Sequence, residues 1–333
     1  GRDGRPAISK NGNFIAFGKD NEIVVYSNRL AVVKNVNLSG ASPGGNYSVL
    51  GISGDGEKIY IRTWNGFLTG GAGGIYEVTA SSGSTQRLDI DESGNTFTYQ
   101  GWSLDQDDFD ITSDGTKAVF VLRDTQDSVS WGTQRTHIWL KDLSSGTVER
   151  IDYKSNLNEM GYSSAPRVNG DGSKIVFISD MSLTEDTTSG SNNIYLWEQG
   201  SGITLINKQN DGTEITSNYG WHADIDSSGN QVVFQTHEAL VSSDTNGISD
   251  VYLKNLNSGA ITKISEGNNG GIYPELSQDG NYVYFESYEV AKSKQVIWNG
   301  TEQAYSKNAL DCSEENKKLI RSFEEQLMDG LSQ

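Results

Sequence analysis

Charged side chains recur at one position of a short strand that is repeated along the chain, and they are the first candidates for chemistry. Asp110, Arg167, Asp224 and Glu275 each stand five residues before a turn glycine, and each is followed by Ile, Val or Leu. Because neighbouring residues of a strand point to opposite faces, packing of the apolar column predicts that the charged column lines a central tunnel. Three carboxylates against one guanidinium predict a net negative tunnel, which favours a cationic group.

Aromatic residues stand just before the same strands, on the segments that enter them. They are Tyr47, Trp102, Tyr162, Trp221, His222 and Tyr273. With the charged column they predict a ligand-binding tunnel mouth for a cationic group, a sugar or a peptide terminus. The alternative interpretation is a solvated channel in which Arg167 neutralises its neighbours and the aromatic rings pack against adjacent loops.

Oxygen-bearing side chains are closely spaced in the segment 244–250. Asp244, Asn246 and Asp250 stand at its first, third and seventh positions, with Gly247 at the fourth. Such a loop can wrap Ca²⁺, a hard cation that binds oxygen ligands. The EF-hand spacing is not met, so the alternative is an Asx-rich turn that holds no metal.

Motifs for other chemistry are scarce. The sequence has no Gly-x-x-x-x-Gly-Lys phosphate loop and no His-Glu-x-x-His zinc motif. Three histidines and one cysteine, Cys312, leave few ways to build a His- or Cys-rich metal centre and no internal disulfide. The sequence therefore favours a binding protein without a catalytic site or a required cofactor.

Charge argues against nucleic acid as a partner, and hydropathy gives no sign of a membrane-spanning helix. The net charge is −18, from 26 Lys and Arg against 44 Asp and Glu, and this charge repels phosphate backbones, so nucleic acid is not expected. The sequence contains no run of about 20 apolar residues, the length that a transmembrane helix needs. The first residues lack the basic and apolar regions of a signal peptide.

The elements that must position these residues form an internal repeat. Six copies of an apolar strand, a turn such as Ser53-Gly54-Asp55-Gly56 and a second apolar strand are present, with turn glycines 44 to 59 residues apart. A second hairpin with its own glycine turn follows in most copies, so each period holds about four strands, the size of a propeller blade. The sequence predicts an all-β fold, a six-bladed β-propeller over residues 1–308, with each blade built from consecutive strands.

The repeat also resembles a known family. The pattern Ser-x-Asp-Gly-x-x-Ile-x-Phe, followed by Ile-Tyr-Leu and Ser-Gly, is similar to the TolB-like, PD40-type propeller repeat. Propellers of this kind include periplasmic scaffold proteins, cell-surface proteins, the propeller halves of prolyl-oligopeptidase-type peptidases and some polysaccharide lyases. The resemblance implies a periplasmic, secreted or cell-surface location.

After the propeller, residues 309–333 form a tail of different composition. Leu319, Phe323, Leu327 and Leu331 recur every four residues, which predicts an amphipathic C-terminal helix. The helix either packs on the propeller or docks on a partner or a second subunit.

These observations lead to two functional hypotheses. The first is a non-enzymatic scaffold of the cell envelope or extracellular space that holds a protein partner at the tunnel mouth or blade edges. The alternative is a carbohydrate-binding or carbohydrate-active propeller, lectin-like or a lyase, because sugar rings stack on aromatic side chains such as Trp102 and Trp221.

Overall fold

The structure is a computed structural model of all 333 residues. It describes residues 6–19, 22–27, 32–38, 47–63, 73–90, 93–96, 108–123, 135–153, 161–185, 187, 192–208, 220–266, 270–289, 292–300 and 303–306. Within these ranges the regular structure is almost entirely β-strand, and no helix is long and apolar enough to cross a membrane. The predicted helix of residues 309–333 and Cys312 lie outside the described residues.

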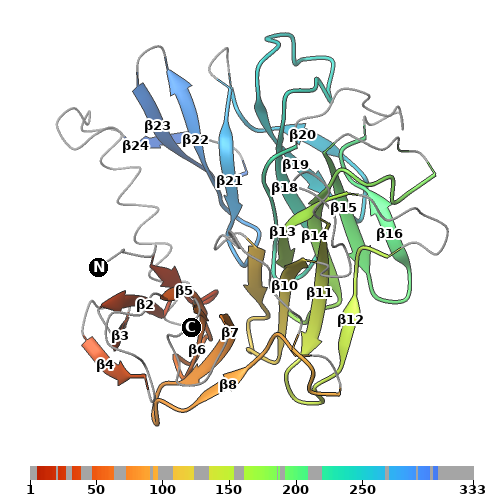
Figure 1. Ribbon diagram of the computed structural model, residues 1–333. Helices are drawn as coiled ribbons and strands as arrows, with labels where there is room; N and C mark the ends of the chain where they lie inside the picture. The colour runs from red at the N-terminus through yellow and green to blue at the C-terminus, as the bar shows by residue number, and fades with distance from the viewer. Residues whose placement is uncertain are drawn as a thin grey trace. The chain divides into compact units, whose positions relative to one another are not determined.

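The described strands form six four-stranded antiparallel sheets, and each sheet uses four consecutive strands (Figure 1). Sheet 1 contains β1 (Ala7–Ile8), β2 (Phe14–Lys19), β3 (Glu22–Ser27) and β4 (Val32–Asn37). Sheet 2 contains β5 (Tyr47–Ile52), β6 (Lys58–Thr63), β7 (Gly74–Thr79) and β8 (Thr85–Arg87). Sheet 3 contains β9 (Phe109–Ile111), β10 (Lys117–Arg123), β11 (Thr136–Asp142) and β12 (Val148–Arg150).

Sheets 4 to 6 repeat this order. Sheet 4 contains β13 (Ser163–Val168), β14 (Lys174–Ser179), β15 (Asn193–Glu198) and β16 (Gly202–Leu205). Sheet 5 contains β17 (Ala223–Ile225), β18 (Gln231–Thr236), β19 (Asp250–Asn255) and β20 (Ile261–Lys263). Sheet 6 contains β21 (Ile272–Leu276), β22 (Val283–Glu289), β23 (Lys292–Trp298) and β24 (Gln303–Ser306). The prediction of an all-β chain with sheets built from consecutive strands is confirmed for the described residues.

The repeated turn that joins the first two strands of each sheet is held by its own side chains. In sheet 2, the Ser53 hydroxyl accepts a hydrogen bond from the N–H of Lys58 at 2.9 Å, and the Asp55 carboxylate accepts from the N–H of Glu57 at 2.9 Å. Gly56 has a φ of +72°, which favours glycine. Equivalent bonds recur in all six sheets, to the first residue of the second strand or, in sheet 6, to the residue just before it, so the turn follows from local sequence.

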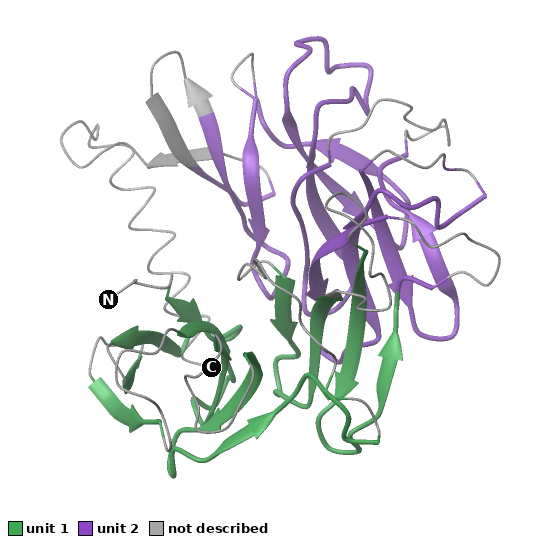
Figure 2. Cartoon of the chain, in the orientation of Figure 1, with its two compact units in different colours: residues 1–151 green, residues 152–333 purple. Residues whose placement is uncertain are grey.

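The chain divides into two compact units, which Figure 2 colours separately. Unit 1 is Gly1–Ile151 and holds sheets 1 to 3; unit 2 is Asp152–Gln333 and holds sheets 4 to 6. The sequence predicts one propeller domain over 1–308, and the boundary between the units falls inside that range. Neighbouring sheets within each unit share apolar clusters. One cluster joins Ile23 of sheet 1 to Ile52 and Ile59 of sheet 2, and another joins Val176 of sheet 4 to Ile225 and Val232 of sheet 5.

The apolar column of the inner strands is buried with one exception. Ile52, Ile111, Val168 and Ile225 are at most 4% exposed, as strand alternation predicts. In β1 the order is reversed, because Ala7 is buried and Ile8 is 62% exposed. The prediction that the residue after the tunnel column packs inside is therefore wrong for sheet 1, where the strand is only two residues long.

Candidate functional site

The predicted tunnel residue of unit 1, Asp110, is committed to neighbouring groups. Its Oδ1 accepts the N–H of Ile111 at 2.9 Å, and its Oδ2 binds the Lys10 ammonium at 2.8 Å. Lys10 belongs to the turn of sheet 1, whereas Asp110 lies on β9 of sheet 3. Lys10 is therefore a neutralising group in addition to the predicted Arg167, and no pattern in the sequence marks it as a partner of Asp110.

The equivalent residue of unit 2, Asp224, joins two sheets. Its Oδ1 accepts the N–H of Ile225 at 2.9 Å, and its Oδ2 accepts the N–H of Leu276 on β21 at 2.8 Å. Both carboxylate oxygens of Asp224 therefore fix backbone groups. Glu275 on β21 is exposed, and Arg167 on β13 donates from Nη1 to the carbonyl oxygen of Pro166 at 3.0 Å.

Aromatic side chains are exposed where the inner strands of unit 2 begin. Tyr162, just before β13, is 43% exposed; Trp221, just before β17, is 50% exposed; and Tyr273, on β21, is 51% exposed. We call these three residues the entry aromatics. His222 contacts Tyr273 edge to face, with ring centroids 4.7 Å apart. Trp102, the predicted counterpart from unit 1, lies outside the described residues, whereas Tyr47 of unit 1 is buried.

Two entry segments have strained backbones. Ala165 and Tyr273 have φ values of +50° and +53°, in the left-handed region that residues other than glycine rarely adopt. Both residues lie where the pairing register shifts, between Ser164 and Arg167 and between Ile272 and Glu275. Bulges of this kind re-aim side chains and are common beside functional sites.

Gln235 on β18 holds the strained Tyr273 segment in place. Its side-chain Oε1 accepts a hydrogen bond from the backbone N–H of Tyr273 at 2.9 Å. The backbone N–H of Gln235 donates to the carbonyl oxygen of His222 at 3.0 Å. Gln235 is buried. Sequence reasoning missed this residue, because a glutamine inside an apolar strand shows no sign of which distant backbone group it binds.

The predicted calcium residues Asp244 and Asp250 share a lysine. Lys263 Nζ lies 2.9 Å from Asp244 Oδ1 and 2.8 Å from Asp250 Oδ2, and the Tyr252 hydroxyl donates to Asp244. Burial alone raises the pKa of Asp244, but the hydrogen bonds from Tyr252 and Lys263 hold it below its usual range. The same carboxylates raise the pKa of Lys263 against the effect of burial.

Asn246 instead shapes the loop, because its Oδ1 accepts the N–H of Ile248 at 3.1 Å. Across the described ranges, no three His, Cys, Asp or Glu side chains form a group that could hold a metal ion. The calcium site at Asp244, Asn246 and Asp250 stays a prediction, and an ammonium group stands between its two carboxylates.

One catalytic spacing in the sequence was also missed. Gly40-Ala41-Ser42-Pro43-Gly44 fits the Gly-x-Ser-x-Gly pattern of a serine nucleophile. These residues are outside the described part, but they connect β4 to β5.

Comparison with family models found no match, and no curated protein matches the sequence. Solved structures do match. The β-propeller domain of the Trilobed protease from Pyrococcus furiosus, whose title describes an open velcro topology, is 18% identical with a TM-score of 0.56, over 92% of this chain and 83% of that one. An acylaminoacyl peptidase from Pyrococcus horikoshii is 16% identical with a TM-score of 0.55, over 92% of this chain and 46% of that one.

TolB from Acinetobacter baumannii is also similar, at 15% identity and a TM-score of 0.47, and the match covers 91% of this chain and 63% of that protein. At 16 to 18% identity the two archaeal matches show the fold alone. The chain therefore has a β-propeller fold, as the resemblance of its repeat implies.

Proposed function

We propose that the chain is a non-enzymatic scaffold that holds a protein partner at the entry aromatics of unit 2. The observation that carries the proposal is the exposure of Tyr162, Trp221 and Tyr273 at the start of three successive inner strands. Tyrosine and tryptophan are enriched in protein interfaces because they bury a large apolar area and keep a polar atom for hydrogen bonding.

Preorganisation supports the same proposal. Gln235 holds the N–H of Tyr273 itself, and Asp224 holds the N–H of Leu276 three residues later on β21, so little conformational entropy remains to be lost when a partner binds. The ring of Tyr273 is further oriented by its contact with His222. Such rigid aromatic residues are typical anchors of an interface.

The six-bladed form and the location are parts of this proposal. Six four-stranded sheets built from consecutive strands support a propeller of six blades, each complete in itself. The resemblance of the repeat supports a place in the periplasm, outside the cell or on its surface. The predicted C-terminal helix would provide a second docking element for a partner or another subunit.

Carbohydrate binding is the second candidate, and Trp221 favours it. Its half-exposed indole offers an apolar face on which a sugar ring can stack, and its neighbour in the chain, His222, contacts Tyr273. The two candidates differ in the size and chemistry of the bound molecule, so one set of variants distinguishes them.

Affinity capture with matched variants tests the proposal. Wild type, the double variant Trp221→Ala/Tyr273→Ala and the control Tyr153→Ala are immobilised and exposed to an envelope fraction and to a glycan array. Tyr153 is 55% exposed but precedes the segment that enters β13, outside the entry aromatics. We expect a protein that is retained by wild type and Tyr153→Ala and lost by the double variant. Retention by all three proteins would contradict the proposal, and loss of a glycan signal alone would favour the second candidate.

A further inference from the structure

Unit 1 contains a cleft of about 440 Å³ between sheets 2 and 3, whereas the entry aromatics belong to unit 2. One wall is built by β6, β7 and β8, and the other by the end of β11 and the turn that leads to β12. This volume falls in the range of about 300 to 1,000 Å³ that is typical of small-molecule sites. The cleft is large enough for a metabolite of several carbon atoms.

Two ammonium groups and one carboxylate line the cleft. Lys141 is buried, and its Nζ donates to the carbonyl oxygens of Leu88 at 3.0 Å and Ile90 at 2.9 Å. Lys58 and Glu77 are the other charged residues among the described part of the lining. These three described side chains sum to one positive charge, whereas the chain as a whole has a net charge of −18.

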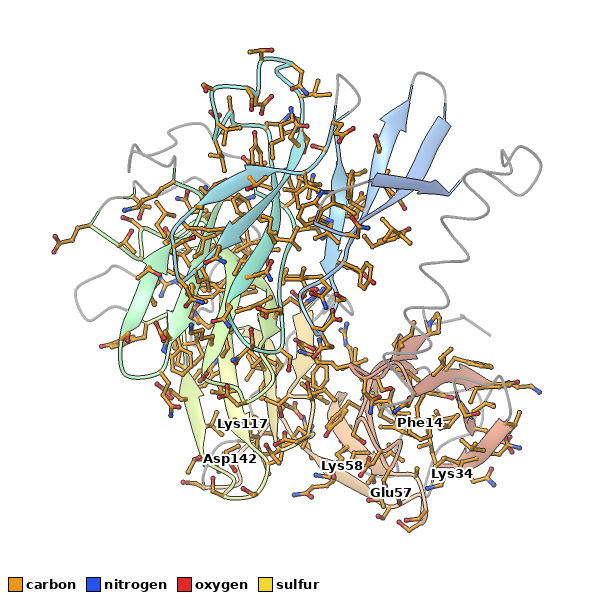
Figure 3. The ribbon with its side chains drawn as sticks, turned by 180° about the vertical axis from the view of Figure 1, so that it is seen from behind. Phe14, Lys34, Glu57, Lys58, Lys117 and Asp142 are labelled. Atoms are coloured by element: carbon orange, nitrogen blue, oxygen red, sulfur yellow. The ribbon has the colours of Figure 1, made fainter. Side chains whose placement is uncertain are left out.

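Lys58 is the residue of the lining that is best placed to take an anion. It begins β6 and is labelled beside Glu57 in Figure 3. Its Nζ lies 3.4 Å from the carbonyl oxygen of Gly115 and 3.6 Å from Glu77 Oε2, and its side chain is 38% exposed. Both distances are long for charge-assisted bonds, so a ligand carboxylate at the usual 2.7 to 2.9 Å would make a stronger contact.

The rest of the lining fits a ligand that carries hydroxyl groups as well as a carboxylate. Gln86, Ser145 and Thr147 offer amide and hydroxyl groups, while Leu88 and Leu143 provide apolar surface for a carbon chain. We propose that this cleft binds a small polyhydroxylated carboxylate, with its carboxylate on Lys58.

Unit 2 provides a matched control for Lys58. Lys174 begins β14 as Lys58 begins β6, and its Nζ donates to the carbonyl oxygen of Gly229 at 3.0 Å and lies 3.6 Å from Glu198 Oε1. Lys174 thus makes the same contact with the next sheet but does not line the cleft. Lys58→Gln and Lys174→Gln remove equivalent structural contacts, and only Lys58→Gln removes the proposed anion contact.

Titration of the full chain with D-gluconate, with sorbitol as the uncharged match, tests the proposal by calorimetry or protein NMR. We expect saturable binding of gluconate, weakened about tenfold or more in Lys58→Gln and less than about twofold in Lys174→Gln. Sorbitol should bind more weakly than gluconate. Thr147→Trp, which keeps both lysines and fills the cleft, should also abolish binding.

Several results would overturn the proposal. These are the absence of saturable gluconate binding to wild type, equal weakening in Lys58→Gln and Lys174→Gln, equal affinity for sorbitol, and full binding by Thr147→Trp. Circular dichroism of each variant shows whether its strands are intact. The outcome is independent of the entry aromatics, which lie in unit 2.

Discussion

The residues that enter the inner strands differ between the two units. Tyr47, which begins β5 in unit 1, is buried, and its hydroxyl donates to the carbonyl oxygen of Glu22. Tyr162, Trp221 and Tyr273 of unit 2 are 43 to 51% exposed. The same repeat thus places an aromatic residue in the core in one case and at the surface in the others. Exposure at these positions, and not their aromatic character, distinguishes a candidate binding surface from packing.

Asp250 in unit 2 is expected to give the largest effect among single substitutions. It is fully buried and binds both Lys263 and Ser265. Asp250→Asn leaves the Lys263 ammonium without this partner, and we expect unfolding free energy to fall by about 3 kcal/mol. Urea denaturation measures the change. If Lys263 is the cation that neutralises these carboxylates, the loss of unfolding free energy in Asp250→Asn is the same in calcium and in chelator. A loss that appears only in calcium would show that a metal ion binds Asp244 and Asp250 instead.

The pair Asp224 and Asp110 sharpens the comparison at the predicted tunnel. Asp224→Ala removes the acceptor of a buried backbone N–H on the next sheet, so we expect a loss of about 2 kcal/mol. Asp110→Ala instead removes an ion pair with Lys10 and should cost about 1 kcal/mol. Chemical denaturation of both variants tests this order. Equal losses would mean that the bond between sheets 5 and 6 contributes no more than the ion pair.

These two carboxylates also show what the sequence could predict and what it could not. The turns were predictable because Ser53, Asp55 and Gly56 act on backbone groups within five residues. The column that contains Asp110 and Asp224 was found from strand periodicity, but the partners of these carboxylates lie 100 and 52 residues away in the chain. Periodicity assigns a side chain to a face of a strand and carries no information on such distant partners.

Two turn glycines provide a comparison of close packing. A Cβ on Gly170 of unit 2 would lie 2.8 Å from the carbonyl oxygen of Ser227 and closer still to its hydroxyl. A Cβ on Gly54 of unit 1 would meet the flexible Asn11 amide at 2.9 Å and the Ser113 carbonyl oxygen at 3.1 Å. We expect Gly170→Ala to lower the melting temperature more than Gly54→Ala, with a cost of about 2 kcal/mol. The reverse order would show that the turns of unit 1 are packed more tightly.

The smallest expected effect is that of acid on the free energy of unfolding. It is negligible near neutral pH and appears only at low pH. The pKa of Asp244 is lowered in the folded protein, so its contribution to stability is present above the unfolded value of about 3.8 and is lost as pH falls through the folded value. Hydrogen bonds from Ser144 and Ser145 likewise lower the pKa of Asp142 in unit 1 to about 2. Stability measured from pH 7 to pH 2 should fall mainly below pH 3.8, and less steeply in Asp244→Asn. A steeper fall in that variant would contradict this assignment.

Site-specific photocrosslinking tests the central claim most directly. A photoreactive phenylalanine analogue placed at 221 or 273 samples the entry aromatics, and the same group at 153 is the exposed control. In the native envelope or medium we predict one protein-sized adduct at 221 and 273 and none at 153, with the partner identified by mass spectrometry. Adducts of equal yield at all three positions, or none at 221 and 273, would contradict a protein-binding surface at the entry aromatics.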